Sequence, residues 1–212
     1  MDPAQPSRSR VLGAADAYEP KRPGPPRCRV PRPQLQAHPD TGRASLADRL
    51  TELRGDVRLR AIRPGDREFL LALYGSTRED ELRLLLWGAP EWALFIGQQF
   101  TAQDRQYRAT YPEGRFALVE LGGSPVGRLY VVRLSDQLHI IDIALMPAYR
   151  GQGIGSALLA GLLAEADDAG IAVTLHVQPQ NPAKRLYERL GFRRRGNGSV
   201  YDFMERPARA VS

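Results

Sequence analysis

The chain has 212 residues, 42% of them hydrophobic and 25% charged, which is typical of a soluble protein with one domain of ordinary size and a tail. No apolar run approaches the roughly 18 residues that a membrane span needs, and the N-terminus lacks the apolar segment of a secretory signal. The single cysteine, Cys28, excludes an intramolecular disulfide, and with only three histidines it argues against a metal site. We therefore expect a cytoplasmic protein.

Residues 1–45 differ in composition from the rest of the chain. They hold nine prolines, and their seven arginines and one lysine against four acidic residues give +4 of the chain's net charge of +6. Proline-rich stretches such as 21–26 and 30–33 cannot hold a helix or a central strand. We expect a disordered basic tail over residues 1–50, ahead of a domain at 51–212. An inert tail, or a start assigned upstream of the true one, is favoured over a tail that recruits the domain to nucleic acid or to a membrane surface.

Hydrophobic periodicity and turn residues define the elements of the domain. In chain order we predict a strand at 57–62, helices after Asp66 and after Thr77 and at 91–107, strands at 116–121, 126–134 and 138–145, a helix at 153–169, a strand at 171–177, a helix at 181–190, and a hairpin of 192–195 with 200–204. Asp66 is expected to cap the first helix, and Gly122 to Pro125 to form the turn of the first hairpin. This order predicts a mixed α/β fold.

The most informative segment is Leu145–Leu159, in which Arg-Gly-x-Gly-x-Gly stands between a strand pattern and an amphipathic helix pattern. Glycine lets backbone N–H groups approach a ligand closely. The start of a helix offers unpaired N–H groups and a positive dipole end, so the segment predicts a site for a phosphate or pyrophosphate. The spacing of the glycines differs from that of the P-loop, and the next strand ends without the acidic residue of a dinucleotide fold.

The same segment resembles a known family. Arg150-x-x-Gly153-x-Gly155, preceded by Leu145-x-Pro147, is similar to the acyl-CoA loop of the GNAT N-acetyltransferase superfamily. Downstream, Asn-Pro-Ala-Lys-Arg-Leu-Tyr-Glu-Arg-Leu-Gly-Phe at 181–192 resembles the second signature of that family. The resemblance covers roughly residues 57 to 206. It implies a GNAT-like fold, in which the strand before the loop and the strand after its helix splay apart, with acetyl-CoA as co-substrate and no metal.

The resemblance also implies which residues bind the cofactor. The pantetheine arm would pair with the strand residues Ile143, Ala144 and Leu145, and one of their amides would face the thioester oxygen. The pyrophosphate would lie on the loop residues, which are Arg150, Gly151, Gln152, Gly153, Ile154, Gly155 and Ser156. The side chain of Arg150 would add positive charge beside the phosphates, and a solvated surface arginine is the alternative. Asn181 is expected to cap its helix and to lie near the pantetheine.

Acetyl transfer to an amine requires a deprotonated amine, a polarised carbonyl and a proton for the departing thiolate. Tyr187 matches the general-acid position of the family, and packing in the core is the alternative. His139, Asp142 and Glu120 are candidates for the general base, and deprotonation through water is the alternative to all three. His139 also fits a surface residue, and Asp142 a structural hydrogen-bonding residue. Because His139 and Asp142 lie three positions apart on one strand, we expect them to face opposite sides of the sheet.

Residues 74–114 are expected to select the substrate. They contain the aromatic residues Trp87, Trp92, Phe95, Tyr107 and Tyr111, which are more often core than pocket. The sequence therefore predicts an N-acetyltransferase that transfers an acetyl group from acetyl-CoA to a primary amine of a small molecule or peptide, without a membrane or nucleic-acid partner. The alternatives are an acyl-CoA-binding module without catalysis, and a domain that its basic tail recruits to nucleic acid. The sequence defines no oligomeric state.

Overall fold

The computed structural model describes residues 46, 50, 56–78, 88–196 and 201–209. Within them, a seven-stranded sheet has the order β1-β2-β3-β4-β5-β7-β6. The strands are β1 (Val57–Ala61), β2 (Arg115–Leu121), β3 (Ser124–Arg133), β4 (Gln137–Leu145), β5 (Ala172–Val177), β6 (Arg193–Gly196) and β7 (Asp202–Arg206). Strands β4 and β5 are parallel and the other neighbours are antiparallel. The expected mixed α/β sheet is therefore confirmed.

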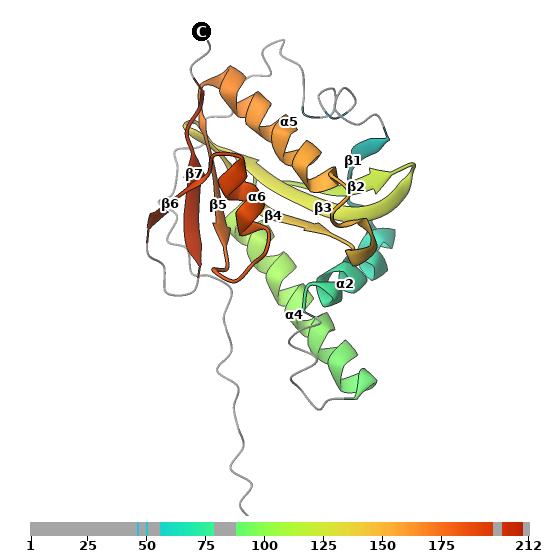
Figure 1. The fold of residues 1–212 in the computed structure, drawn as a ribbon. Coiled ribbons are helices and arrows are strands. Elements are labelled where there is room, and N and C mark those ends of the chain that lie inside the picture. The colour runs from blue at the N-terminus through green and yellow to red at the C-terminus, as the bar shows by residue number, and fades with distance from the viewer. Residues whose placement is uncertain (1–45, 47–49, 51–55, 79–87, 197–200, 210–212) are drawn as a thin grey trace, which may run out of the picture.

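Helices cover both faces of this sheet. They are α2 (Arg67–Ser76), α4 (Ala89–Thr110), α5 (Ile154–Ala169) and α6 (Lys184–Arg189), with 3-10 turns η1 (Pro64–Asp66) and η2 (Pro147–Tyr149). Figure 1 shows α5 on one face, and α2 with α4 on the other. In the part of the chain that the structure describes, none of the helices combines the length and the apolar character needed to cross a membrane.

Each face of the sheet has its own apolar core. On the α5 face, Leu158 and Leu162 are fully buried against the sheet, together with side chains from α6. Leu46 and Leu50 belong to this core and are 2% and 0% exposed. On the other face a smaller cluster joins α2 and α4 to β2, and its buried members are Leu70, Tyr74, Ile96, Phe100 and Leu118. The sheet is thus the middle layer of three. Its strands carry apolar side chains on both faces, and each face must be covered.

The turn of the first hairpin is shorter than expected. Gly122 and Gly123, with φ of 57° and 83°, form it alone, and Ser124 and Pro125 already belong to β3. Two residues with positive φ suit the right-handed twist of a tight hairpin. The helix expected after Thr77 falls mostly on residues 79–87, which lie outside the described residues.

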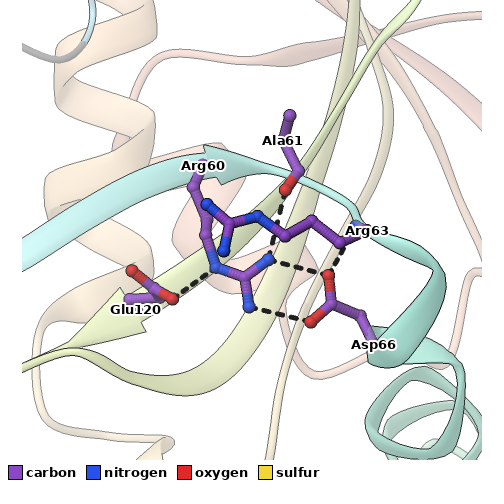
Figure 2. Close-up of polar contacts among 5 residues, drawn as sticks. All are labelled: Arg60, Ala61, Arg63, Asp66 and Glu120. Carbon is purple, nitrogen blue, oxygen red and sulfur yellow. Dashed lines mark hydrogen bonds and ion pairs between the residues drawn. The ribbon is translucent and has the colours of Figure 1, made fainter.

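Asp66 does not cap α2 with its side chain as expected, although it occupies the N-cap position. Its carboxylate instead accepts hydrogen bonds from Nη1 and Nη2 of Arg60, at 2.7 and 2.8 Å, and from the backbone N–H of Arg63. Figure 2 shows Arg60 between Asp66 and Glu120, to which its Nε donates at 2.5 Å. These bonds, those of Arg60 first, lower the pKa of Asp66 to about 2. The junction fastens the end of β1 to β2 and to the start of α2.

Candidate active site

A gap opens between β4 and β5 where their parallel pairing ends. The β3–β4 ladder pairs Tyr130 with Asp142 and Val131 with Ile140. Ile141 is therefore an extra residue, a β-bulge, which bends its strand and increases the local twist. The parallel ladder between β4 and β5 ends at Ile140 and Leu175, so the rest of β4 diverges from β5. The splayed strand pair is present, and Ile143, Ala144 and Leu145 lie on the diverging part.

The bulge also changes which side chains share a face. His139 pairs with Val132 of β3, and Asp142 pairs with Tyr130, two residues away on the same strand. His139 and Asp142 therefore face the same side of the sheet, and the expectation that they face opposite sides is wrong. Their contacts agree, because the ring of Tyr111 lies against His139 and the hydroxyl of Tyr107 donates to Asp142. The expectation holds for a regular strand, in which successive side chains alternate between the two faces. One additional residue in β4 reverses that alternation.

The segment after β4 builds an exposed helix N-terminus. Gly151 and Gly153 have φ of 73° and 83°, and Gly153 is the N-cap of α5. No side chain among the described residues caps this terminus, and the first N–H groups of a helix have no partner inside it. Ile154 is fully buried and anchors the loop, while Gly153 and Ser156 are exposed. The geometry fits an anion held by backbone N–H groups.

The side chains of Gln152 and Arg150 bond to backbone oxygens of the surrounding structure. Nε2 of Gln152 donates to the carbonyl of Ala148 at 2.7 Å. Nε of Arg150 donates to the carbonyl of Leu145 at 2.8 Å, and its Nη2 lies 3.4 Å from the carbonyl and the hydroxyl of Ser76. Arg150 therefore joins the end of β4 to the end of α2, and its contact with phosphate stays a prediction.

Tyr187 lies on α6 and belongs to the apolar core on the α5 side of the sheet. It is 6% exposed, and its ring packs edge-on against Phe192 at 5.7 Å between centroids. Burial, and then the charge of Asp142, raise the pKa of Tyr187 to about 12. Upstream, Oδ1 of Asn181 accepts a hydrogen bond from the N–H of Ala183 at 2.9 Å, in the turn before α6. The N-cap of α6 is Ala183, so Asn181 does not cap this helix as expected.

Asp142 belongs to a buried ion pair. Nε and Nη2 of Arg128 donate to its two carboxylate oxygens at 3.1 and 2.9 Å. The side chain of Arg128 is 3% exposed and that of Asp142 is 16% exposed. Gln103 and Tyr107 of α4 complete the group, since Gln103 accepts from Arg128 at 3.0 Å and Tyr107 donates to Asp142 at 3.3 Å. Both oxygens of Asp142 are thus already hydrogen-bonded, as in a structural ion pair.

His139 is buried and neutral. Burial, and then the charge of a protonated His176, lower its pKa to about 4. Its Nδ1 lies 2.9 Å from Oγ1 of Thr174 on β5, and that hydroxyl donates to Oε1 of Gln137 at 2.8 Å. The third base candidate, Glu120, lies on β2, two strands from β4, and bonds to Arg60 of β1. The structure therefore does not bring it to the gap.

The aromatic residues of the preceding helices divide into two groups. Trp92 stacks on Phe95 in the cluster between α2 and α4, whereas Tyr107 and Tyr111 reach the polar face of β4. Trp87 lies outside the described residues. Among the described residues, no cluster of three or more histidine, cysteine, aspartate or glutamate side chains is placed to hold a metal.

Sequence reasoning missed Arg128 and Thr174, which contact the base candidates Asp142 and His139. One signal was available for Arg128, which is the one charged residue in the run Val126–Val132. A buried arginine requires a partner, and Asp142 was the acidic residue in the neighbouring apolar strand. Thr174 carried no such signal, because threonine is ordinary in a strand.

Comparison with known proteins agrees with this geometry. The model of the acetyltransferase (GNAT) family matches residues 80–192, which is more than half of the chain. The [ribosomal protein bS18]-alanine N-acetyltransferase of Haemophilus influenzae is 36% identical over 58 residues, which are 27% of this chain and 40% of that protein. The alignment thus spans less than half of the length of this relative.

Solved structures share the fold at low sequence identity. The PaiA N-acetyltransferase of Thermoplasma acidophilum, in complex with coenzyme A, is 16% identical with a TM-score of 0.54, over 71% of this chain and 98% of that one. An acetyltransferase of Thermus thermophilus is 23% identical with a TM-score of 0.52, over 71% and 96% of the two chains.

Proposed function

This chain belongs to the GNAT acetyltransferase family, and from this premise we propose that it transfers an acetyl group from acetyl-CoA to a primary amine of a small molecule or peptide. The observation that carries the proposal is the combination of the gap between β4 and β5 with the N-terminus of α5 at Gly153. A pantetheine arm fits beside the diverging residues Ile143 to Leu145. A pyrophosphate fits the N–H groups from Gly151 to Ser156.

Two side chains are assigned the proton transfers. The pKa of Tyr187, raised to about 12, keeps its hydroxyl protonated at neutral pH, so its O–H can donate to the departing sulfur. The pKa of His139, lowered to about 4, keeps its imidazole neutral, so one ring nitrogen can accept the proton of the attacking amine. As the C–N bond forms, the amine loses basicity, and a weak base then suffices. Asp142 is assigned a structural role on this face of the sheet and not that of the base, because Arg128 already binds both of its oxygens.

The acceptor class is inferred from the relative. The Haemophilus protein acts, by its name, on an alanine of a ribosomal protein. An α-amino group has a pKa of about 7.7 to 8.0, below that of lysine at about 10.4, and so presents more of its neutral form at neutral pH. A peptide N-terminus is therefore the first acceptor to test, ahead of lysine and of small amines. A cytoplasmic location belongs to the same proposal and is supported by the single cysteine.

Tyr187→Phe is the test of catalysis. With acetyl-CoA and a panel of peptides and amines, measured through the released thiol, we expect kcat to fall about tenfold or more while the affinity for CoA changes little. Tyr74→Phe, which alters a buried tyrosine of the α2 cluster, is the matched control and should keep full turnover.

The outcomes separate the alternatives. Full turnover in Tyr187→Phe would remove this residue from the mechanism. A protein that binds CoA tightly and accelerates no transfer would instead be an acyl-CoA-binding module.

A further inference from the structure

Three polar side chains form a hydrogen-bond chain on the α4 face of the sheet. They are Gln137 and His139 of β4 and Thr174 of β5, and His139 and Thr174 face each other in the parallel ladder. Nδ1 of His139 lies 2.9 Å from Oγ1 of Thr174, and this hydroxyl lies 2.8 Å from Oε1 of Gln137. His139 is 7% exposed and Thr174 is 2% exposed, so water does not compete freely for these bonds.

The direction of each bond in this chain follows from proton counting. The carbonyl oxygen of the Gln137 amide only accepts, and a threonine hydroxyl has a single proton. Thr174 must therefore donate to Gln137, and its oxygen is then an acceptor toward His139. The Nδ1 of a neutral His139 consequently carries the ring proton, and Nε2 carries the lone pair.

The groups around His139 favour this neutral form. The ring of Tyr111, the C-cap of α4, lies 5.7 Å from its centroid, and that of His176 from β5 lies 5.5 Å away, edge-on. A second imidazole and a phenol supply no negative charge that would hold an imidazolium. The carboxylate on the same face, Asp142, is paired with Arg128.

We propose that Thr174 and Gln137 are positioning residues, which hold His139 as the Nδ1–H tautomer so that Nε2 receives the proton of the acceptor amine. This inference rests on the proposed function. When the amine nitrogen attacks, its C–N bond forms, and one N–H proton passes to Nε2 of His139. The C–S bond breaks, its electron pair leaves with the sulfur, and the sulfur gains the proton of Tyr187. The imidazolium of His139 keeps Nδ1–H on Thr174 and releases its other proton to water. The phenolate of Tyr187 takes up a proton from water, so both side chains regain their starting forms.

Three substitutions test this hydrogen-bond chain. Thr174→Val keeps the shape of the side chain and removes both hydrogen bonds, Thr174→Ser keeps the hydroxyl, and Gln137→Leu removes the final acceptor. In the full-length protein, the tautomer of His139 is read from the ¹⁵N and ¹H shifts of its ring, and kcat and the KM for acetyl-CoA are measured beside it. The ring shifts report on the hydrogen bonds without requiring any turnover.

The wild type should show Nδ1–H and an unprotonated Nε2. In Thr174→Val the tautomers should mix, and kcat should fall about tenfold, within the range for general-base catalysis, at an unchanged KM for acetyl-CoA. Thr174→Ser should restore both readouts. In Gln137→Leu the freed hydroxyl proton can turn toward Nδ1, so the Nε2–H tautomer should gain population while kcat falls.

An Nε2–H tautomer in the wild type would overturn the inference. A Thr174→Val protein with the kcat of the wild type would also overturn it. If Tyr187→Phe has lost activity in the same assay, the unchanged kcat of Thr174→Val removes the positioning role and leaves the proposed function standing. If the protein binds CoA but transfers no acetyl group, the proposed function is overturned. The catalytic role of the hydrogen bonds among Gln137, Thr174 and His139 then falls with it, whichever tautomer His139 adopts.

Discussion

Backbone conformation at single glycines decides the geometry of the loop before α5. Gly153 has φ of 83° and sits where the helix offers its N–H groups. Gly151 has φ of 73°, so both positions disfavour side chains that carry a Cβ. Gly127 of β3 is constrained differently, because an added Cβ would collide with the carbonyl of Ala144 and the side chain of Leu145. Close packing of β3 on the diverging end of β4 requires this glycine.

Gly153→Val should abolish CoA binding, because a β-branched residue strains this backbone and fills the space beside the N–H groups. Gly123→Val is the matched control: its φ is also 83°, its Cβ would meet nothing within 4 Å, and it lies in the β2–β3 turn. Melting curves should show a similar loss of stability in both variants, and calorimetric titration should show lost CoA affinity in Gly153→Val alone. Unchanged affinity in a folded Gly153→Val protein would place the cofactor elsewhere.

At this scale, prediction from sequence succeeds where a residue acts locally. The glycines of the loop before α5 have a backbone conformation that depends on neighbouring residues, so their spacing identifies them. Arg128 and Thr174 act through partners on other strands, and no local pattern pairs them with Asp142 or His139. The role of Tyr187 came from a family signature and stays a proposal.

Among the elements, β4 carries most of the site. Its bulge at Ile141 lies directly after the last residue that pairs with β5, Ile140. The bulge also places His139 and Asp142 on the same face of the sheet. The bounds of the strands and helices could be predicted within a few residues from hydrophobic periodicity. Their register could not, because a single extra residue inverts the alternation and leaves hydrophobicity unchanged.

The ion pair of Arg128 and Asp142 binds β3 to the bulged strand. Arg128→Met leaves the carboxylate of Asp142 without its partner in a buried place, and we expect a loss of about 3 to 5 kcal/mol in the free energy of unfolding. Arg133→Met on the same strand is the control, because Arg133 pairs with Glu165 at 34% and 22% side-chain exposure and should cost less than about 1 kcal/mol. Urea unfolding measures both, and equal losses would contradict the assignment.

The ion pairs at the junction of β1, β2 and α2 should make the free energy of unfolding depend on pH in the acidic range. The pKa of Asp66 falls from 3.8 to about 2 on folding. A carboxyl with a lowered pKa stabilises the fold above its unfolded pKa and loses that contribution as the pH falls through the folded one. Asp66→Asn should therefore be less stable at neutral pH, by an amount on the order of 1 kcal/mol because the pair contacts solvent. The difference should vanish between pH 4 and pH 2, as thermal melts across this range would measure. A constant difference would rule out the carboxylate as its source.

Over the whole molecule, the core reaches further toward the N-terminus than the predicted domain start at residue 51. Leu46 and Leu50 are buried in the α5-side core. A chain of residues 46–212 should keep the melting temperature and CoA affinity of the full-length protein. A chain of residues 51–212 should lose stability, since removing one buried leucine side chain costs about 2 to 5 kcal/mol.

Equal stability of the two truncated chains would show that Leu46 and Leu50 contribute nothing. The longer chain also tests the tail: DNA binding that weakens with salt in the full-length protein and is absent from residues 46–212 would favour recruitment to nucleic acid.

The fold class followed from the order of strand and helix patterns, and the three-layer arrangement followed from burial on both faces of the sheet. The parallel pairing of β4 with β5 was not among the predictions, although a crossover that contains a helix, here α5, is typical of it. The contacts of Tyr107 and Tyr111 with β4 could not be predicted, since these residues become neighbours of β4 only after α4 has packed across the sheet.

Strand β6 forms one edge of the sheet and presents three consecutive exposed residues, Arg193 to Arg195. A sheet edge is a template on which a second molecule can add a strand, and fibrous aggregates grow in this way. Two copies that align these edges would bring their arginines together, and the carboxylates of β7 that pair with Arg194 and Arg195, Asp202 and Glu205, offset only part of that charge. The arginines therefore disfavour self-association at this edge. This colloidal protection is electrostatic, and concentrated salt, which screens it within a few ångströms, should remove it first.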